Sequence, residues 1–229
     1  MTTQTEGAVL QRDGKTYAVT TRIPAGIITP DQLETIARVG RTYRVPILKM
    51  TSGQRVLFAG LKPEDVPWVL ADLGPLAQPE SAPCVKFVQA CLGTEMCRYG
   101  NQDSISLARA LEERFRDKTF PAKVKIGVSG CQRCCSESQT RDVGIMGTNR
   151  GWTVFFGGNA GRNARIGDLI ARDLTAAEVL DCTSRLLEYY RCNAPANERT
   201  ARFMERVGME TLKSELLTLL PYIQIEKVK

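Results

Sequence analysis

The 229-residue chain contains no histidine. This absence excludes imidazole-ligated haem, zinc sites that use histidine, and catalysis by Ser-His or Cys-His pairs. The sequence also lacks an apolar run of the roughly 20 residues that a helix needs to cross a bilayer. It lacks the G-x-G-x-x-G motif of nicotinamide and flavin sites. Thiol chemistry is what remains, since the chain has 8 cysteines.

Composition is that of a globular protein with one large or two small domains. Hydrophobic residues make up 43% and charged residues 24% of the chain, which is ordinary for soluble domains. The first residues show neither the basic nor the apolar segment of a signal peptide, so we expect a cytoplasmic protein. In a reducing compartment, cysteines serve as metal ligands or buried side chains more often than as disulfides.

Basic residues exceed acidic ones, and the formal net charge is +6. The lysines and arginines are scattered, and no aromatic RNA-binding motif or helix-turn-helix pattern accompanies them. An anionic small molecule or a polycarboxylate cofactor explains the surplus as well as a nucleic acid does. We therefore expect neither a nucleic-acid partner nor a membrane partner.

Strand and helix signals alternate over the first part of the chain. A strand is expected at 17–20, and Thr29, Pro30 and Gln32 form a capped helix start. The buried stripe of that helix is predicted to contain Leu33, Ile36, Ala37 and Tyr43. Two short strands at 46–50 and 56–59 and a helix at 64–73 follow. This order predicts a small α+β module.

The segment 74–83 is rich in proline and small residues and is the candidate linker. We place the domain boundary within it, with domains at 1–79 and 80–229. The second domain is predicted to contain helices at 104–115 and 175–190, strands at 123–128 and 153–156, and a helical tail at 199–220. The predicted fold class is α+β.

Two short loops each carry a pair of cysteines. Cys91 and Cys97 form a C-x5-C clip, and Cys131 and Cys135 form a C-x3-C clip. Together the clips supply four thiolates, the number that one cubane iron–sulfur cluster needs. The strand predicted at 123–128 leads directly into the second clip, where Gly130 permits a close backbone approach.

Other interpretations of the clips are an all-cysteine zinc site or cysteines that are merely buried. Zinc sites favour C-x2-C to C-x4-C spacings, so the x5 spacing fits zinc poorly. The spacing alone favours a cluster and leaves the other two interpretations open.

The clips and the segments around them resemble the sirohaem-dependent sulfite and nitrite reductases. The matching segments are the two clips, Ser129-Gly130 before the second clip, and residues 142–147, 156–158, 22–33 and 51–61. They occur in the family's order over about residues 17–190. The chain is most similar to the small, single-repeat members called assimilatory-type. Full-length members carry two repeats, so a homodimer or a partner chain is a candidate to complete the cofactor's cover.

The resemblance implies a ferredoxin-like first module, followed by a mixed α/β domain that binds sirohaem and a [4Fe–4S] cluster. It assigns the cluster to Cys91, Cys97, Cys131 and Cys135. It also assigns to Cys135 a second bond, to the sirohaem iron, which would couple the two centres in a chain without histidine.

The resemblance further implies cations that hold an anionic substrate. Lys123 and Lys125 match a Pro-x-Lys-x-Lys pattern, and Arg22 matches an arginine with the same role. The two lysines alternate on the predicted strand and share a face. The competing interpretation is that all three are solvated surface charges.

Sirohaem contacts are implied for Gln54, Arg55, Arg133, Asn159 and Arg162. Arginine suits them because it binds carboxylates in a bidentate manner. The loop 157–162 also resembles an anion-binding turn with exposed backbone N–H groups; a plain turn is the alternative.

Some positions depart from the family pattern. Gly53 replaces a substrate-binding arginine, and Arg55, on the same side of an expected extended strand, is a candidate substitute. Arg133 replaces a small polar residue, and Cys134 adds a thiol beside Cys135. Cys182 and Cys192 are expected in the core, and Cys84 receives no role.

The sequence therefore predicts an oxidoreductase with sirohaem and a [4Fe–4S] cluster, which reduces sulfite to sulfide or nitrite to ammonia by six electrons. The missing dinucleotide motif implies an external donor such as a ferredoxin-like protein. The alternatives are an electron-transfer or sensor module with little turnover, motivated by Gly53, and a zinc-stabilised interaction protein.

Overall fold

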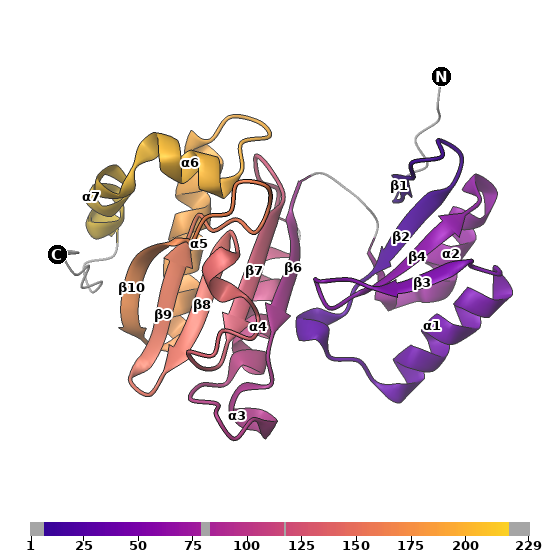
Figure 1. The fold of residues 1–229 in the computed structure, drawn as a ribbon, viewed down its shortest axis with the longest axis horizontal. Helices are drawn as coiled ribbons and strands as arrows, with labels where there is room; N and C mark the ends of the chain where they lie inside the picture. Colours follow the sequence, from indigo (N-terminus) through magenta and orange to yellow (C-terminus); the bar gives the residue numbers. More distant parts are fainter. Residues whose placement is uncertain (1–6, 79–82, 117, 220–229) are drawn as a thin grey trace. The chain divides into compact units, whose positions relative to one another are not determined.

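The computed structural model describes residues 7–78, 83–116 and 118–219. The chain forms two compact units, Met1–Ala82 and Pro83–Lys229 (Figure 1). Each unit has its own five-stranded sheet. Within the described ranges, no helix is both long and apolar enough to span a membrane.

The first unit has the order of a ferredoxin-like module. Its strands are β1 (Val9–Leu10), β2 (Tyr17–Thr21), β3 (Ile47–Met50), β4 (Val56–Leu61) and β5 (Ala77–Gln78). They pair antiparallel in the order β1-β2-β4-β3, and β5 also pairs with β2. Helices α1 (Pro30–Thr42) and α2 (Val66–Leu73) complete a β-α-β-β-α-β succession from β2 to β5.

Helix α1 begins as the sequence predicts. The Thr29 hydroxyl accepts the Gln32 backbone N–H, and the Gln32 side chain accepts the Thr29 N–H, so the capping box is complete. The predicted stripe is wrong at Leu33, which is 50% exposed. Val39, three residues after the buried Ile36, is buried instead and belongs with Ile36 to the core of the first unit.

Part of the candidate linker packs with the first unit. Helix α2 ends at Gly74, which has a φ of 52°. The chain then forms a 3-10 turn, Gly74–Leu76, and the short strand β5. Leu76 is buried in the core of the first unit. Residues 74–78 therefore belong to that unit, while residues 79–82 lie outside the described ranges.

The second unit is a mixed sheet in the order β10-β9-β8-β7-β6. Strands β6 (Val85–Ala90), β7 (Val124–Ser129) and β8 (Val143–Thr148) are parallel, and β9 (Gly151–Phe156) and β10 (Asp168–Leu174) are antiparallel. Helices α4 (Ser104–Phe115) and α5 (Ala176–Asn193) pack on the sheet, and Figure 1 shows both behind it.

The carboxyl ends of β6 and β7 place the two cysteine clips side by side. Ala90 pairs in parallel register with Val128, so the residues that follow leave the sheet at the same edge. The first clip encloses the one-turn helix α3 (Gly93–Met96), and α4 follows the clip. Ligand sites of open α/β sheets form at this edge.

The predicted helical tail is two helices rather than one. Helix α6 (Thr200–Val207) ends at Gly208, whose φ of 79° breaks the helical path, and α7 (Met209–Leu219) follows. Phe203 and Met204 of α6 are buried. Phe203 makes edge-on contacts with Tyr189 and Tyr190 of α5, so α6 packs against α5.

Candidate functional site

The two cysteine clips meet through backbone hydrogen bonds. The Cys91 N–H donates to the Val128 carbonyl at 3.2 Å and extends the β6–β7 pairing by one residue. The Gly130 N–H donates to the Cys91 sulfur at 3.1 Å. The Ser104 hydroxyl donates to the Cys91 carbonyl at 2.8 Å. The first cysteine of one clip is therefore bonded to the residue before the other clip.

Glycines allow the clip backbones to touch. A Cβ on Gly130 would lie 2.6 Å from the Gly93 Cα, and a Cβ on Gly100 would lie 2.4 Å from the Gly93 carbonyl carbon. The Gly130 carbonyl accepts the N–H groups of Asn101 and Gln102 at 2.9 and 3.0 Å. Side chains larger than hydrogen at these glycines would separate the clips.

The four predicted ligands differ in exposure. Cys131 is buried, Cys91 and Cys97 are half-buried, and Cys135 is exposed. Among the described residues, no three cysteine, aspartate or glutamate side chains are grouped closely enough to hold a metal ion. The donor set nevertheless fits an iron–sulfur cluster in number and chemistry, and the N–H bond at Cys91 is the kind that tunes cluster sulfurs.

The second clip turns sharply. Cys134 and Glu137 have φ values of 57° and 53°, and the Glu137 N–H donates to the Cys134 carbonyl at 2.8 Å. The Ser136 N–H donates to the Ser129 hydroxyl at 3.1 Å, which brings the loop back to the end of β7. Cys134 and Cys135 thus occupy different environments, the first half-buried and the second exposed.

A buried arginine anchors the end of this loop. Arg141 is 4% exposed, and it donates to Gln89 on β6 at 2.6 Å and to Glu137 at 2.9 Å. Its guanidinium also lies 5.6 Å from the centre of the Phe87 ring. The sequence analysis did not single out Arg141; the charged residue immediately before the matched 142–147 segment was the available signal.

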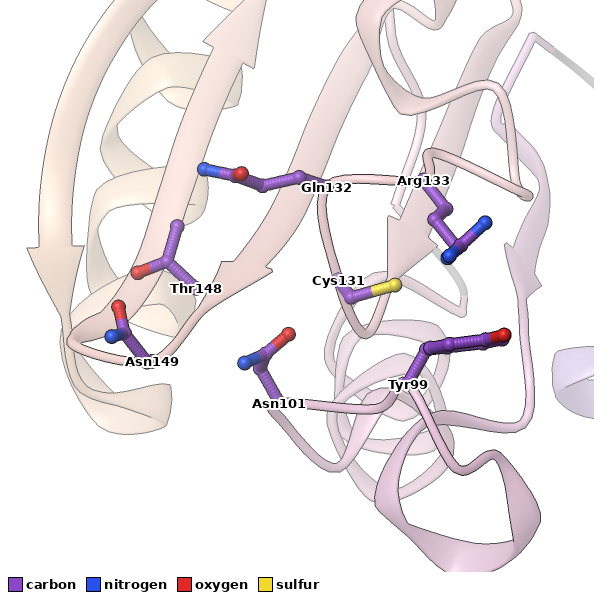
Figure 2. A pocket seen from close by; sticks show the side chains of 7 residues that line it. All are labelled: Tyr99, Asn101, Cys131, Gln132, Arg133, Thr148 and Asn149. Carbon is purple, nitrogen blue, oxygen red and sulfur yellow. The ribbon is translucent and has the colours of Figure 1, made fainter.

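A cavity of about 540 Å³ opens beside the clips (Figure 2). It is lined by Tyr99, Asn101, Cys131, Gln132, Arg133, Thr148 and Asn149. Only Cys131 and Arg133 among these were predicted as site residues. Tyr99 and Asn101 come from the loop after α3, Thr148 ends β8, and Asn149 follows it. Their polar character next to matched segments was the one signal for them.

The candidate substrate lysines lie at the start of β7. Lys123 is exposed and directly precedes the strand, whereas Lys125 is half-buried within it. Burial lowers the pKa of Lys125, and the positive charges of Arg199 and Lys123 lower it further. Its ammonium lies 5.9 Å from the centre of the Phe87 ring.

A buried carboxylate holds the backbone of Lys125. Asp142 is 1% exposed and accepts the Lys125 N–H at 2.8 Å. The same carboxylate accepts the Arg199 Nη2 group at 2.7 and 2.9 Å, the Arg199 Nε–H at 3.3 Å, and the Thr200 hydroxyl. Asp142 therefore joins β7 to the start of α6, and sequence reasoning missed this link.

The predicted residues of the first unit lie at one turn and one strand end. Thr51 and Gln54 are bonded across a turn in which Gln54 has a φ of 60°. The expected extended strand is therefore wrong here, and Arg55 does not replace position 53 by alternation. Arg55 is buried and donates to the Gln78 side chain, while Arg22 is half-buried at the end of β2.

Three N–H groups of the glycine-rich loop after β9 have partners within the second unit. Gly157 donates to the Asp142 carbonyl at 2.9 Å, Asn159 to the Arg165 carbonyl at 2.9 Å, and Gly161 to the Asn159 side chain at 3.2 Å. The Arg165 side chain donates to Asp168 at 2.6 Å. Arg162 is exposed, so its guanidinium is accessible to a carboxylate from solvent.

The cysteines outside the clips have separate positions. Cys182 is buried, as predicted, and its burial raises its pKa to about 12. Cys192 is exposed, so the prediction of a core position is wrong. It lies near the carboxyl end of α5, where its thiol donates to Glu188 at 3.4 Å. Cys84 is half-buried, and its backbone forms an isolated antiparallel β-bridge with Thr119.

Family models cover most of the chain. Residues 81–221 match the nitrite and sulphite reductase 4Fe-4S domain, and residues 9–76 match the nitrite/sulfite reductase ferredoxin-like half domain. The chain belongs to the nitrite and sulfite reductase family. The predicted resemblance and fold class are thereby confirmed, and the family's 4Fe-4S domain supports an iron–sulfur cluster over a zinc site.

Curated relatives include enzymes named for both substrates. The chain is 44% identical to the assimilatory-type sulfite reductase of Nitratidesulfovibrio vulgaris, over 95% of this chain and 100% of that protein. It is 41% identical to the nitrite reductase [NAD(P)H] of Bacillus subtilis, over 91% of this chain and 26% of that protein. The chain thus matches the whole of the sulfite reductase but only about a quarter of the length of the nitrite reductase.

Solved structures share the fold at low identity. The Mycobacterium tuberculosis NirA protein superposes with a TM-score of 0.76 at 18% identity, over 89% of this chain and 40% of that chain. A dissimilatory sulfite reductase I superposes with a TM-score of 0.80 at 15% identity, over 93% of this chain and 72% of that chain. These similarities concern the fold alone.

Proposed function

We propose that this protein reduces sulfite to sulfide, or nitrite to ammonia, with a [4Fe–4S] cluster and sirohaem as its cofactors. The observation that carries the proposal is the meeting of two cysteine clips, at the Cys91 sulfur and the Gly130 N–H, in a chain of the nitrite and sulfite reductase family. The clips supply four thiols at one sheet edge, where the chemistry of the donor set fits a cluster.

We assign the cluster to Cys91, Cys97, Cys131 and Cys135. Cys135 is the exposed member, which supports its second assignment, as the ligand that also contacts sirohaem. When bound, the cluster and sirohaem supply electrons and an open iron face for the substrate. Arg133, Asn159 and Arg162 of the second unit, and Gln54 and Arg55 of the first, remain the proposed sirohaem contacts.

Lys123, Lys125 and Arg22 are the proposed substrate cations. Lys125 suits this role best, because its half-buried ammonium is screened by water less than an exposed charge. Its lowered pKa also makes it a better proton donor than an ordinary lysine. Asp142 keeps its backbone in place through the 2.8 Å bond to the Lys125 N–H.

Sulfite is the favoured substrate. The alignment spans the whole of the N. vulgaris sulfite reductase, whereas it spans only 26% of the B. subtilis nitrite reductase. The identity is also slightly higher to the sulfite reductase, at 44% against 41%. Nitrite remains the second substrate to test.

An external electron donor, such as a ferredoxin-like protein, is part of the proposal. It is supported by the missing G-x-G-x-x-G motif in the sequence. A homodimer and a cytoplasmic location are also proposed, the first because one repeat covers sirohaem less completely than two.

The alternative, an electron-transfer or sensor module with little turnover, is not favoured by relatives named as reductases.

The proposal is tested by a reductase assay on protein purified without oxygen. A chemically reduced dye supplies electrons, and sulfide or ammonia is measured with sulfite or nitrite as the sole acceptor. We expect sulfide formation at a higher kcat/KM than ammonia formation. Dye oxidation without either product, in protein that contains both cofactors, would favour the electron-transfer alternative.

A further inference from the structure

Two side chains, one from each clip region, contact each other in the cavity beside Cys131. Tyr99 follows the first clip by two residues, and Arg133 lies inside the second clip. The Arg133 guanidinium carbon is 3.8 Å from the centre of the Tyr99 ring. This is a close cation–π contact, well within the roughly 6 Å at which such contacts are attractive.

Cys131 lies behind this contact. Both side chains and Cys131 line the same cavity. Figure 2 shows the Cys131 sulfur directed toward the space between the Arg133 guanidinium and the Tyr99 ring. Cys131 is nevertheless 8% exposed, so its thiol is almost closed from solvent although the cavity beside it is open.

We propose that Arg133 and Tyr99 form a cover over Cys131 that limits the access of small molecules to the metal site from this cavity. The proposal rests on the proposed cluster ligation by Cys131. Arg133 and Tyr99 act as a pair, because each comes from a different loop and the stacked contact is what holds them across the cavity. Their role in this proposal is to shield the Cys131 sulfur, and it is separate from the sirohaem contact proposed for Arg133.

The residue types suit a cover. The planar guanidinium of arginine stacks on an aromatic face, and it cannot lose its charge at physiological pH. Arg98 approaches the same ring, with its guanidinium carbon 4.6 Å from the ring centre, and also donates to the Tyr99 hydroxyl. Arg98 is not among the cavity-lining residues. It therefore provides a matched control of the same residue type on the same ring.

The first test measures alkylation of Cys131 in the full-length chain after removal of bound iron. Neutral iodoacetamide is used at a pH above which the alkylation rate of Cys131 no longer increases. At that pH the thiol is fully deprotonated in every variant, so differences in rate report access. Peptide mass spectrometry compares Cys131 with exposed Cys192 and buried Cys182 as internal references. We expect Tyr99→Ala and Arg133→Met each to raise the Cys131 rate about threefold or more relative to Cys192.

The double variant tests whether the two residues act together. If they form one cover, Tyr99→Ala with Arg133→Met will react no faster than the faster single variant. Arg98→Met should leave the Cys131 rate unchanged. Unchanged Cys131 rates in both single variants would overturn the proposal, and so would rate increases that multiply in the double variant or an equal increase in Arg98→Met. If Tyr99→Ala does not fold by thermal melt, Tyr99→Leu replaces it.

The second test uses the protein as purified without oxygen. A ferrous-iron chelator is added, and the release of iron is followed by absorbance. We expect the Arg133→Met and Tyr99→Ala proteins to lose iron faster than the parent and the Arg98→Met protein; equal rates in all four would contradict the cover. Purified protein without iron would defeat the proposed cluster instead, and the alkylation comparison would still decide the cover.

Discussion

The backbone N–H of Gly130 donates a 3.1 Å hydrogen bond to the sulfur of Cys91, a residue 39 positions earlier in the chain. Parallel pairing of β6 with β7 produces this contact, because it brings the carboxyl ends of the two strands to the same edge. The bond places the thiols of both clips at one end of the second unit's sheet. The proposed iron–sulfur site depends on it.

The first prediction concerns Gly130. In Gly130→Ala, the new Cβ would lie 2.6 Å from the Gly93 Cα and 2.8 Å from the Gln102 carbonyl oxygen. We expect the clips to separate and the iron content of the purified protein to fall several-fold. Gly14→Ala, in the first unit, is the control for backbone strain without a clash: its φ of 68° disfavours alanine, but its Cβ meets nothing within 4 Å. Normal iron content in Gly130→Ala would show that the close approach is not needed.

The second prediction separates two adjacent cysteines. Cys135→Ser should remove most of the sirohaem and its coupling to the cluster, because we assign this exposed thiol to both metal centres. Cys134→Ser should be far milder, since Cys134 is proposed to bind neither. Absorption and electron paramagnetic resonance spectra of the two variants provide the comparison. Equal losses in both would mean that the wrong member of the pair has been assigned.

The third prediction concerns the substrate lysines. Lys125→Ala should lower turnover by about 100-fold, with a smaller loss in Lys123→Ala, because Lys123 is exposed and its charge is screened by water. The cofactor spectrum should change little in either. Lys118→Ala is the control, because that lysine lies over the Phe115 ring instead. Full activity in both variants would make the lysines ordinary surface charges.

Lys125 also predicts a pH dependence. Its pKa lies below the ordinary value of 10.5 because of burial, Arg199, Lys123 and Arg141, against an opposing contribution from Asp142. The charged form is present below the shifted pKa and is lost as pH rises through it. Turnover should therefore decline on the alkaline side before pH 10.5, and in Lys123→Gln this decline should move to higher pH. A decline that stays in place in Lys123→Gln would argue against Lys125 as its source.

The fourth prediction compares two arginines of the loop after β9. Arg162→Ala should lower the affinity for sirohaem, because its exposed guanidinium is proposed to bind a peripheral carboxylate. Arg165→Ala should instead lower thermal stability, because Arg165 bonds to Asp168 and to the Gly157 carbonyl. Sirohaem titration and a thermal melt distinguish these effects. Tight sirohaem binding by the Arg162→Ala protein would remove this residue from the site.

Local sequence signals predicted much of the fold. The capped start at Thr29 gave the beginning of α1, because its side chain bonds to backbone within three residues. The helix predicted from residue 175 also begins there, and the structure shows a capping box at Thr175. Leu33 was placed wrongly, because periodicity does not reveal which apolar residue a unit leaves exposed. The extended path expected from Gly53 to Arg55 was also wrong, because the turn at Gln54 requires a positive φ that its sequence does not signal.

The candidate site was predictable only in part. The cysteine spacing indicated the clips, but their contact at Gly130 depends on the pairing of β6 with β7, which is a long-range property. The links from Asp142 to Arg199 and from Arg133 to Tyr99 join loops that are distant in sequence. Such pairs have no periodic or local pattern, so only the fold reveals them.

The most direct test of the proposed two-cofactor site is the absorption spectrum and metal content of the full chain purified without oxygen. We expect sirohaem bands together with cluster absorption, with iron bound through the two clips and lost in Cys91→Ser and Cys131→Ser. Stoichiometric zinc, without iron and without sirohaem bands, would contradict it.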